Sequence, residues 1–239
     1  MTSNKYHNTR ARAVNETWLK RCDHGVFFTN APLNDSSIPY RTVFAGIPDR
    51  YELLFFKSRF AFKYIYEHMG LDFEWYMKAD DDTYIIMENL KAYLSTLDAS
   101  KPYYLGYRLK PYFRAGYNGG GAGYVLSKEA LRLFSEYAYP NETICPDDKY
   151  EDVGIARCLE ALGITPHKTI NDKSQQRFNT YSWQEALNGF DKDTDWILDQ
   201  PPIRGMDGIP SDLISFHHMS PDEIRIFDVL LYKVKITGR

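Results

Sequence analysis

The sequence predicts an α/β domain in which a mixed β-sheet is flanked by helices. Short apolar runs that suit strands alternate with longer segments of helical periodicity along the 239 residues. One apolar run, residues 73–79, leads directly into three aspartates at 80–82, and open α/β sheets hold their ligands at the carboxyl ends of strands. Neither an internal repeat nor a linker divides the chain, so we expect a single domain over residues 1–239.

Helices and short strands are expected to alternate through the first half of the chain. The predicted helices are 9–20, 50–69 and 87–97, and the predicted strands are 25–29, 41–44, 73–79 and 103–106. In the second of these helices a 3-4-4 spacing of apolar residues predicts one buried face, which comprises Leu53, Phe56, Phe60 and Tyr64. Gly70 is expected to end this helix.

The second half of the chain is expected to be ordered at both ends and irregular between them. The predicted elements are a helix over 128–137, a helix that opens at 151, a strand over 213–218 and a helix over 221–234. Ser127 stands where it can cap the first of these helices. Residues 165–212 carry four prolines and little periodicity, so we expect a loop-rich region there.

Charge and composition exclude some classes of protein. The formal net charge is −3, which does not favour nucleic acid as a partner. Aromatic residues make up 15% of the chain, and such side chains serve both as core and as platforms for sugars. The sequence contains no apolar run long enough for a transmembrane helix and no signal-peptide pattern.

The acidic triplet Asp80, Asp81 and Asp82 is the strongest chemical signal. Adjacent like charges repel, and a divalent cation would offset that repulsion, because hard oxygen ligands suit Mg²⁺ or Mn²⁺. A cation held there could bind a diphosphate. The alternative is a solvated acidic turn or a helix cap, since a helix is predicted just downstream.

A glycine-rich stretch over residues 119–123 precedes Tyr124. Glycines permit close backbone approaches that side chains block, so Gly120 and Gly121 could lie against a ligand. A tight turn into a strand explains the same pattern. A phosphate-binding loop of the Lys-Ser/Thr type is excluded, because that ending is absent.

Glu151 and Asp152 form a second carboxylate pair at a predicted helix start. A carboxylate there can act as a general base, and helix capping is the simpler alternative. Cys145 and Cys158 bracket the pair and are spaced for a disulfide that would hold it in place.

Two further side chains, His217 and Lys78, each have two possible roles. His217 follows an apolar strand and could bind Mn²⁺, although a structural role is also open and His218 competes for either one. Lys78 could face phosphates or could be a charge at the edge of the sheet.

The first residues and the cysteines suggest further sequence upstream. Residues 10–14 are basic, with no apolar strand before them, so we expect an upstream strand and a membrane anchor to be missing from this chain. Cys22 is left without a partner. Three sequons, at Asn15, Asn34 and Asn141, permit N-glycosylation in a secretory compartment.

Together the triplet, the base-like carboxylate, the late histidine and the glycine turn favour a metal-dependent glycosyltransferase over a nuclease or a phosphatase. The sequence resembles the animal β1,3-glycosyltransferases that include fringe, and within them the core 1 β1,3-galactosyltransferases. The segments that carry the resemblance are 11–18, 21–22, 75–84, 110–112, 116–131, 151–153, 157–158 and 215–217.

The resemblance implies a GT-A fold, that is, a Rossmann-like mixed sheet flanked by helices, with Mn²⁺ as cofactor. It assigns Asp80 and Asp82 to the metal-binding pattern, with His217 as a further ligand and Asp152 as the base. In-line attack on the donor would then invert the anomeric carbon. Residues 165–212 would form the acceptor region. Cys22 would pair with a cysteine of the family's first strand, so we expect it to be unpaired here.

The resemblance also implies the ligands and the setting. Donor contacts are expected from Lys78, Asp80, Asp81, Gly120 and Gly121. The donor would be UDP-galactose, and the acceptor the 3-hydroxyl of O-linked GalNAc on glycoproteins. Members are type II Golgi membrane proteins with luminal catalytic domains, and a homodimer is a further expectation.

Two departures leave the acceptor open. Residues 208–212 stand where core 1 enzymes carry an adjacent cysteine pair, and residues 181–185 with Trp196 replace their acceptor-region pattern. A related β1,3-transferase with another donor or acceptor is therefore an alternative. A non-catalytic chaperone branch of the family is another, although that branch lacks the aspartate triplet.

Overall fold

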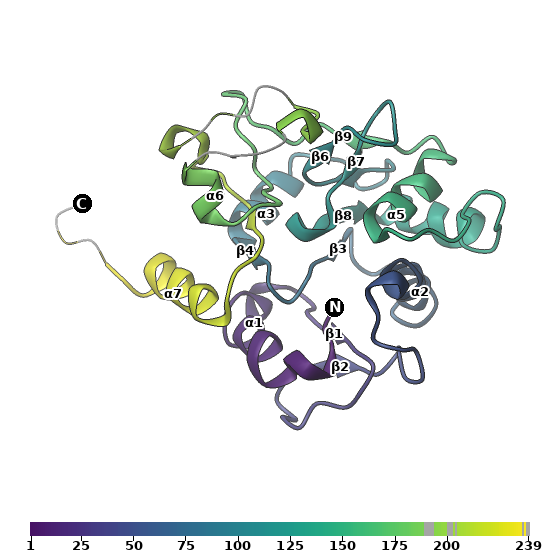
Figure 1. Cartoon of the computed structure of the whole chain (residues 1–239), viewed down its shortest axis with the longest axis horizontal. Coiled ribbons are helices and arrows are strands. Elements are labelled where there is room, and N and C mark those ends of the chain that lie inside the picture. Colours follow the sequence, from purple (N-terminus) through teal and green to yellow (C-terminus); the bar gives the residue numbers. More distant parts are fainter. Residues whose placement is uncertain (189–193, 200–202, 204, 236, 238–239) are drawn as a thin grey trace.

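The molecule is built around a mixed sheet of four strands (Figure 1). The computed structural model describes residues 1–188, 194–199, 203, 205–235 and 237. The strand order is β3-β8-β5-β9, formed by β3 (Trp75–Lys78), β8 (Tyr124–Ser127), β5 (Tyr104–Leu105) and β9 (Pro166–His167). The first three run antiparallel and β9 runs parallel to β5, which confirms the predicted mixed α/β class.

Three small two-stranded sheets surround this central one. β1 (Phe27–Phe28) runs parallel to β2 (Tyr40–Arg41), and β10 (Ser215–Phe216) runs antiparallel to β4 (Tyr84–Ile85). The third pair is the hairpin of β6 (Arg108–Leu109) and β7 (Tyr117–Asn118). The β10–β4 pair brings the late histidine strand beside the residues that follow the aspartate triplet.

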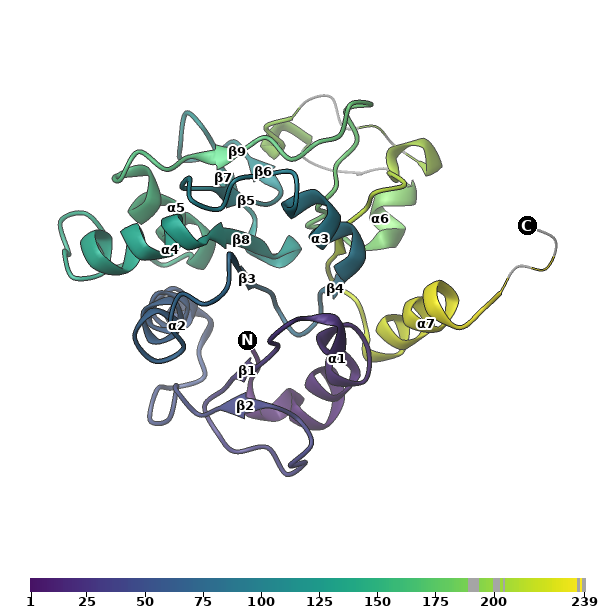
Figure 2. The ribbon, with the colours of Figure 1, turned by 180° about the vertical axis from the view of Figure 1, so that it is seen from behind.

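The helices form two groups at opposite ends of the sheet (Figure 2). α2 (Leu54–His68), α4 (Lys128–Leu133) and α5 (Glu151–Glu160) contact one another at one end. At the other end lie α3 (Met87–Leu94), α6 (Trp183–Asn188) and α7 (Pro221–Tyr232). No helix in the described ranges is both long and apolar enough to cross a membrane.

Local signals set several helix boundaries as predicted. The Ser127 hydroxyl accepts a hydrogen bond from the Ala130 amide at 3.1 Å and caps α4. Gly70 follows the end of α2 with a φ of +69°. Ser220 and Glu223 form a reciprocal capping box at the start of α7.

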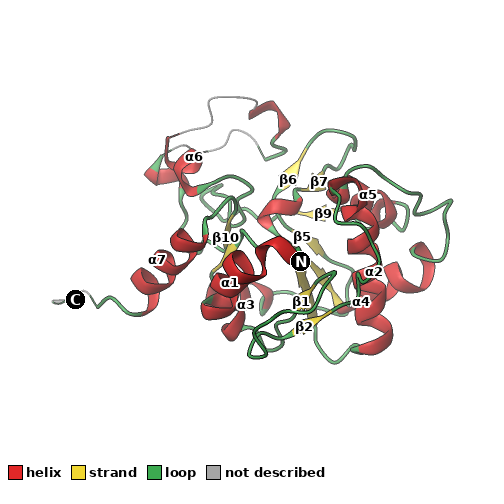
Figure 3. Cartoon of the chain, turned by 60° about the horizontal axis from the view of Figure 1, so that its bottom comes forward, coloured by secondary structure: helices red, strands yellow, loops and turns green. Residues whose placement is uncertain are grey.

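The amino-terminal helix is irregular but continuous with the prediction for residues 9–20. A 3-10 helix (Asn4–Tyr6), one π-helical turn (His7–Ala11), α1 (Arg12–Glu16) and a second 3-10 helix (Trp18–Arg21) succeed one another. α1 packs on α7, so a helix from the start of the chain lies beside one from near its end (Figure 3).

The predicted buried face of the second helix was wrong. Phe56 is 42% exposed and stacks on Phe60, whereas Phe55 and Phe62 are buried. Apolar residues surround most of this helix, so spacing alone did not decide which side faces inward. Gly154 of α5 lets the inward side approach closely, because a Cβ there would lie 2.4 Å from the Phe55 ring.

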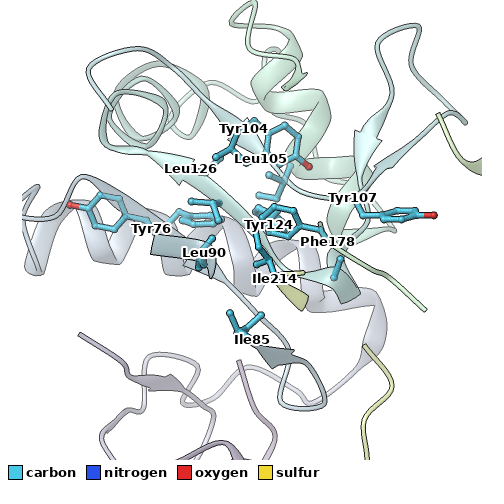
Figure 4. Packing of buried hydrophobic residues seen from close by; sticks show 14 of the residues in the cluster. Tyr76, Ile85, Leu90, Tyr104, Leu105, Tyr107, Tyr124, Leu126, Phe178 and Ile214 are labelled. Carbon is cyan, nitrogen blue, oxygen red and sulfur yellow. The ribbon is translucent and has the colours of Figure 1, made fainter. Parts of the chain in front are cut away.

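The core is rich in tyrosine (Figure 4). Tyr104 and Tyr124 are fully buried, and their rings meet edge to face at 5.5 Å. A cavity of about 430 Å³ lies between β1 and β3 and reaches Asp80 and Asp81. For these tyrosines the structure selects the core role, one of the two that the sequence left open for aromatic residues.

Candidate functional site

Asp80 leaves the end of β3 and is neutralised by Lys78. The Lys78 ammonium lies 2.8 Å from Asp80 Oδ1 and 3.5 Å from Glu151 Oε2, and it donates to the Gly120 carbonyl at 3.3 Å. Burial opposes ionisation of Asp80, but the charges of Lys78, the chain's amino terminus and His217 together outweigh burial and lower the pKa of this carboxyl. Lys78 ends β3, the edge strand of the central sheet, as one of the two alternatives expected, but its side chain is buried rather than exposed to water.

Asp81 and Asp82 share a second cation. Arg10 lies 3.3 Å from Asp81 and 3.0 Å from Asp82, and its guanidinium stacks over Tyr6. The Thr2 hydroxyl donates to Asp81 at 2.6 Å, and burial raises the pKa of Asp81. Protein cations thus offset part of the repulsion within the triplet.

Asp82 faces His217 across the site. The distance from His217 Nε2 to Asp82 Oδ1 is 3.3 Å, and His217 Nδ1 lies 3.1 Å from the Thr180 carbonyl. Because a carbonyl only accepts, Nδ1 carries a hydrogen and Nε2 is directed at the carboxylate. Burial disfavours the imidazolium, but the hydrogen bond to Asp82 and the negative charges of Asp82 and Asp80 together outweigh burial and raise the pKa of His217.

His218 completes a cluster that could hold a metal ion. Its ring lies 3.8 Å from that of His217, and one ligand atom from each of Asp82, His217 and His218 lies within 4.8 Å of the others. Asp80 faces Lys78 instead. A set of carboxylate and imidazole donors is the kind that binds Mn²⁺.

The glycine turn closes over this cluster. Gly120–Ala122 form a single 3-10 turn before β8, so the predicted turn into a strand is confirmed. A Cβ at Gly121 would lie 2.1 Å from His217 Nδ1, and one at Gly120 would lie 2.8 Å from Glu151 Oε2. The Thr83 hydroxyl donates to the Gly121 carbonyl at 2.8 Å. The backbone therefore lies against the site residues.

Asp152 lies at the start of α5 and touches the same turn. Its Oδ2 accepts from the Gly120 amide at 3.1 Å, and its Oδ1 accepts from the Val153 amide at 2.9 Å. One carboxylate oxygen thus accepts a hydrogen bond from the first turn of α5, and the other accepts one from the glycine turn. Burial raises the pKa of Asp152, which makes it a stronger base than an exposed aspartate.

The neighbouring Glu151 is buried and structural. It accepts a hydrogen bond from the Tyr124 hydroxyl at 2.7 Å, and burial raises its pKa. Together with Lys78 and Asp80 it forms a buried charge network beneath the turn. The sequence indicated Glu151 only as a carboxylate next to the candidate base, and the ion pair between Glu151 and Lys78 was not predicted.

The predicted disulfide is present and Cys22 is free. Cys145 and Cys158 are bonded across 13 residues, which ties α5 to the loop before it. Cys22 is unpaired, and burial raises the pKa of its thiol to about 11.

The sequence analysis missed Arg10 and the share of His218 in the cluster. Arg10 lies more than seventy residues from its partners, and nothing local in the sequence connects them. His218 was visible only as a competitor of His217.

Comparisons with known proteins agree with this layout. A mixed sheet with carboxylates at the end of a strand is consistent with a glycosyltransferase fold, and the family model described as Fringe-like matches residues 1–178. The chain belongs to the fringe-like family, as its motifs predicted.

Several relatives are named glycosyltransferases. The chain is 32% identical to glycoprotein-N-acetylgalactosamine 3-beta-galactosyltransferase 1 of Xenopus laevis, over 100% of this chain and 66% of that protein. It is 32% identical to chondroitin sulfate synthase 3 of Mus musculus, over 69% of this chain and 20% of that protein. It is 30% identical to beta-1,3-glucosyltransferase of Mus musculus, over 68% of this chain and 32% of that protein. The chain therefore spans less than two thirds of the length of each.

Proposed function

We propose that the chain is an inverting, Mn²⁺-dependent β1,3-glycosyltransferase with a GT-A fold. In this proposal it transfers galactose from UDP-galactose to the 3-hydroxyl of O-linked GalNAc on glycoproteins. The observation that carries it is the convergence of Asp82, His217 and Asp152 on one glycine turn. Similarity over the whole chain to the Xenopus galactosyltransferase supports the choice of donor and acceptor.

The donor set fits the metal. Asp82 and His217 would hold Mn²⁺, and His218 is close enough to join them. His217 meets the requirement for a ligating imidazole, because its other nitrogen is anchored on the Thr180 carbonyl. When bound, Mn²⁺ supplies positive charge to the diphosphate leaving group.

The chain's own residues divide the remaining work. Lys78 holds Asp80 in place, and the missing side chains at Gly120 and Gly121 leave room for Glu151 and His217 to pack against the turn. Asp152 takes the proton of the acceptor hydroxyl while the hydroxyl oxygen bonds to the anomeric carbon of the donor sugar. The bond from that carbon to UDP breaks, so the products are UDP and a β-linked disaccharide.

The test is transfer from UDP-galactose to a GalNAc-α-Thr peptide, with Mn²⁺ and with chelator. A Mn²⁺-dependent β1,3 product identified by NMR would support the proposal. No product while UDP and Mn²⁺ still bind would overturn the donor or acceptor but leave the class standing. Loss of binding as well would favour the chaperone alternative.

A second candidate keeps the chemistry and changes the substrates. The segments 181–185 and 208–212 depart from the core 1 pattern in the acceptor region, and relatives named for chondroitin and glucose chemistry match most of this chain. Transfer from UDP-glucose, UDP-GlcNAc or UDP-glucuronate in the same assay would favour this candidate.

The proposal extends to location and assembly. A luminal Golgi domain on a type II anchor agrees with the disulfide, and sequon residues Asn34 and Asn141 are exposed. For assembly we propose a homodimer through α7. The outer face of that helix exposes Ile226, Val229 and Leu230.

A further inference from the structure

Two exposed tyrosines stand beside the candidate base without a role in the core. Tyr112 is 58% exposed and Tyr150 is 39% exposed. Their ring centroids lie 6.4 Å apart and the ring planes differ by 32°. The two tilted rings are neighbours and form a small aromatic shelf, with both side chains partly open to water.

The fold fixes this shelf close to Asp152. Tyr150 is the residue immediately before α5, two positions from Asp152. Tyr112 lies in the β6–β7 hairpin and its ring contacts Tyr117 at 6.0 Å. Tyr117 belongs to β7, which packs on α5 (Figures 1 and 3). Burial and then the charge of Asp152 raise the pKa of Tyr117, in agreement with the packing of β7 on α5.

The backbone at Tyr112 is strained. Its φ is +76°, a left-handed conformation that bulky residues rarely adopt and that glycine would adopt freely. The strained position presents a largely exposed ring, whose aromatic neighbours are Tyr117 and Tyr150. Strained, exposed residues beside a candidate base are where ligand contacts concentrate.

The adjoining acceptor region also approaches this hairpin. The Lys110 amide donates to the Trp196 carbonyl at 2.7 Å, and Leu109 forms a bridge with Ile197. Trp196 is 44% exposed. The hairpin therefore lies between the carboxylate at the start of α5 and the part of the chain assigned to the acceptor.

We propose that Tyr112 and Tyr150 form the subsite that stacks on the pyranose ring of the acceptor sugar. A pyranose has an apolar face of C–H groups that fits an aromatic surface, while its hydroxyls stay free for hydrogen bonds. Stacking there would hold the attacking hydroxyl toward Asp152. This assignment rests on the proposed transferase function and names the part of the site that recognises the acceptor.

The test uses Tyr112→Gly, which removes the ring and suits the positive φ, and Tyr112→Phe, which keeps the ring. Tyr112→Gly should raise the KM for the GalNAc-α-Thr peptide about tenfold and leave the KM for UDP-galactose unchanged. Tyr112→Phe should stay within about twofold of the parent chain. Tyr137→Ala is the control, because Tyr137 is 54% exposed in another part of the surface.

A second measurement separates failure of the subsite from failure of the function. Saturation-transfer NMR with methyl α-N-acetylgalactosaminide reports sugar binding without any transfer. Loss of that signal in Tyr112→Gly alone supports the subsite even if galactose is not the donor. An unchanged acceptor KM in Tyr112→Gly, or an unchanged NMR signal in that variant, overturns the subsite while leaving the transferase proposal intact.

Discussion

At the scale of single residues, a substitution of Asp152 should affect the transfer reaction without affecting the binding of UDP and Mn²⁺. Its carboxylate touches the glycine turn but is not in the cluster of Asp82, His217 and His218. We therefore expect Asp152→Asn to keep the affinity for UDP and Mn²⁺ and to lose transfer by at least about 100-fold. Calorimetry measures the binding and a radiolabelled transfer assay the rate. Equal transfer by the variant would refute the assignment of the base.

The pH dependence should follow the same carboxylate. Burial raises the pKa of Asp152 above 3.8, and a base acts only when deprotonated. Activity should therefore fall as the pH drops through this raised pKa and level off above it. A profile of kcat/KM measures the midpoint. The residual activity of Asp152→Asn should not fall at low pH. If it falls with the same midpoint as in the parent chain, another group is the one whose protonation limits the rate.

Lys78 should matter for stability as much as for binding. It is the cation between the buried carboxylate of Glu151 and the partly exposed one of Asp80, so Lys78→Met would remove the ion-pair partner of both. Losing one partner of a buried ionic network costs about 3–5 kcal/mol. Lys91→Met is a matched control, since Lys91 pairs with Asp23 at the surface and should cost less than about 1 kcal/mol. Urea denaturation compares the two.

At the scale of elements, the disulfide determines how firmly the start of α5 is held. It closes a loop across 13 residues, for which the chain-entropy model gives about 3 kcal/mol. Cys145→Ser with Cys158→Ser should lower the melting temperature and also reduce kcat, because Asp152 lies between the two positions. Cys22→Ser changes a free thiol and should alter neither. A lower melting temperature with unchanged kcat would limit the disulfide to stability.

Local sequence signals predicted where helices and turns begin and end better than they predicted which distant residues pack together. The Ser127 cap, the Gly70 stop and the disulfide follow from neighbouring residues, and each was predictable. The inward face of α2 was not predictable, because it packs on distant segments such as Gly154 of α5, nearly a hundred residues away in the chain. The same holds within the site. The triplet was visible in the sequence, but the pairing of Asp80 with Lys78 and of Asp82 with Arg10 depends on side chains that meet only in the folded chain.

At the scale of the whole molecule, α7 should decide self-association. Its outer face is apolar at Ile226, Val229 and Leu230, its first turn carries Asp222 and Glu223, and Lys233 and Lys235 follow its end. Two copies packed antiparallel would bring these opposite charges together and cover the apolar stripe. One helix buries less than a standard interface, so we expect a dissociation constant in the micromolar range or weaker, of order 1 μM or above.

Leu230→Glu should abolish this dimer without loss of folding, because Leu230 is 58% exposed. Sedimentation velocity over a range of concentrations measures the association, and thermal melting confirms the fold. Met206→Glu is the matched control, since Met206 is 83% exposed outside α7 and should leave the association unchanged. Persistence of the dimer in Leu230→Glu would move the interface away from α7. The start of α5 lies in the other helix group, so transfer activity should be the same in the monomeric variant; a loss of activity there would instead make the dimer part of the site.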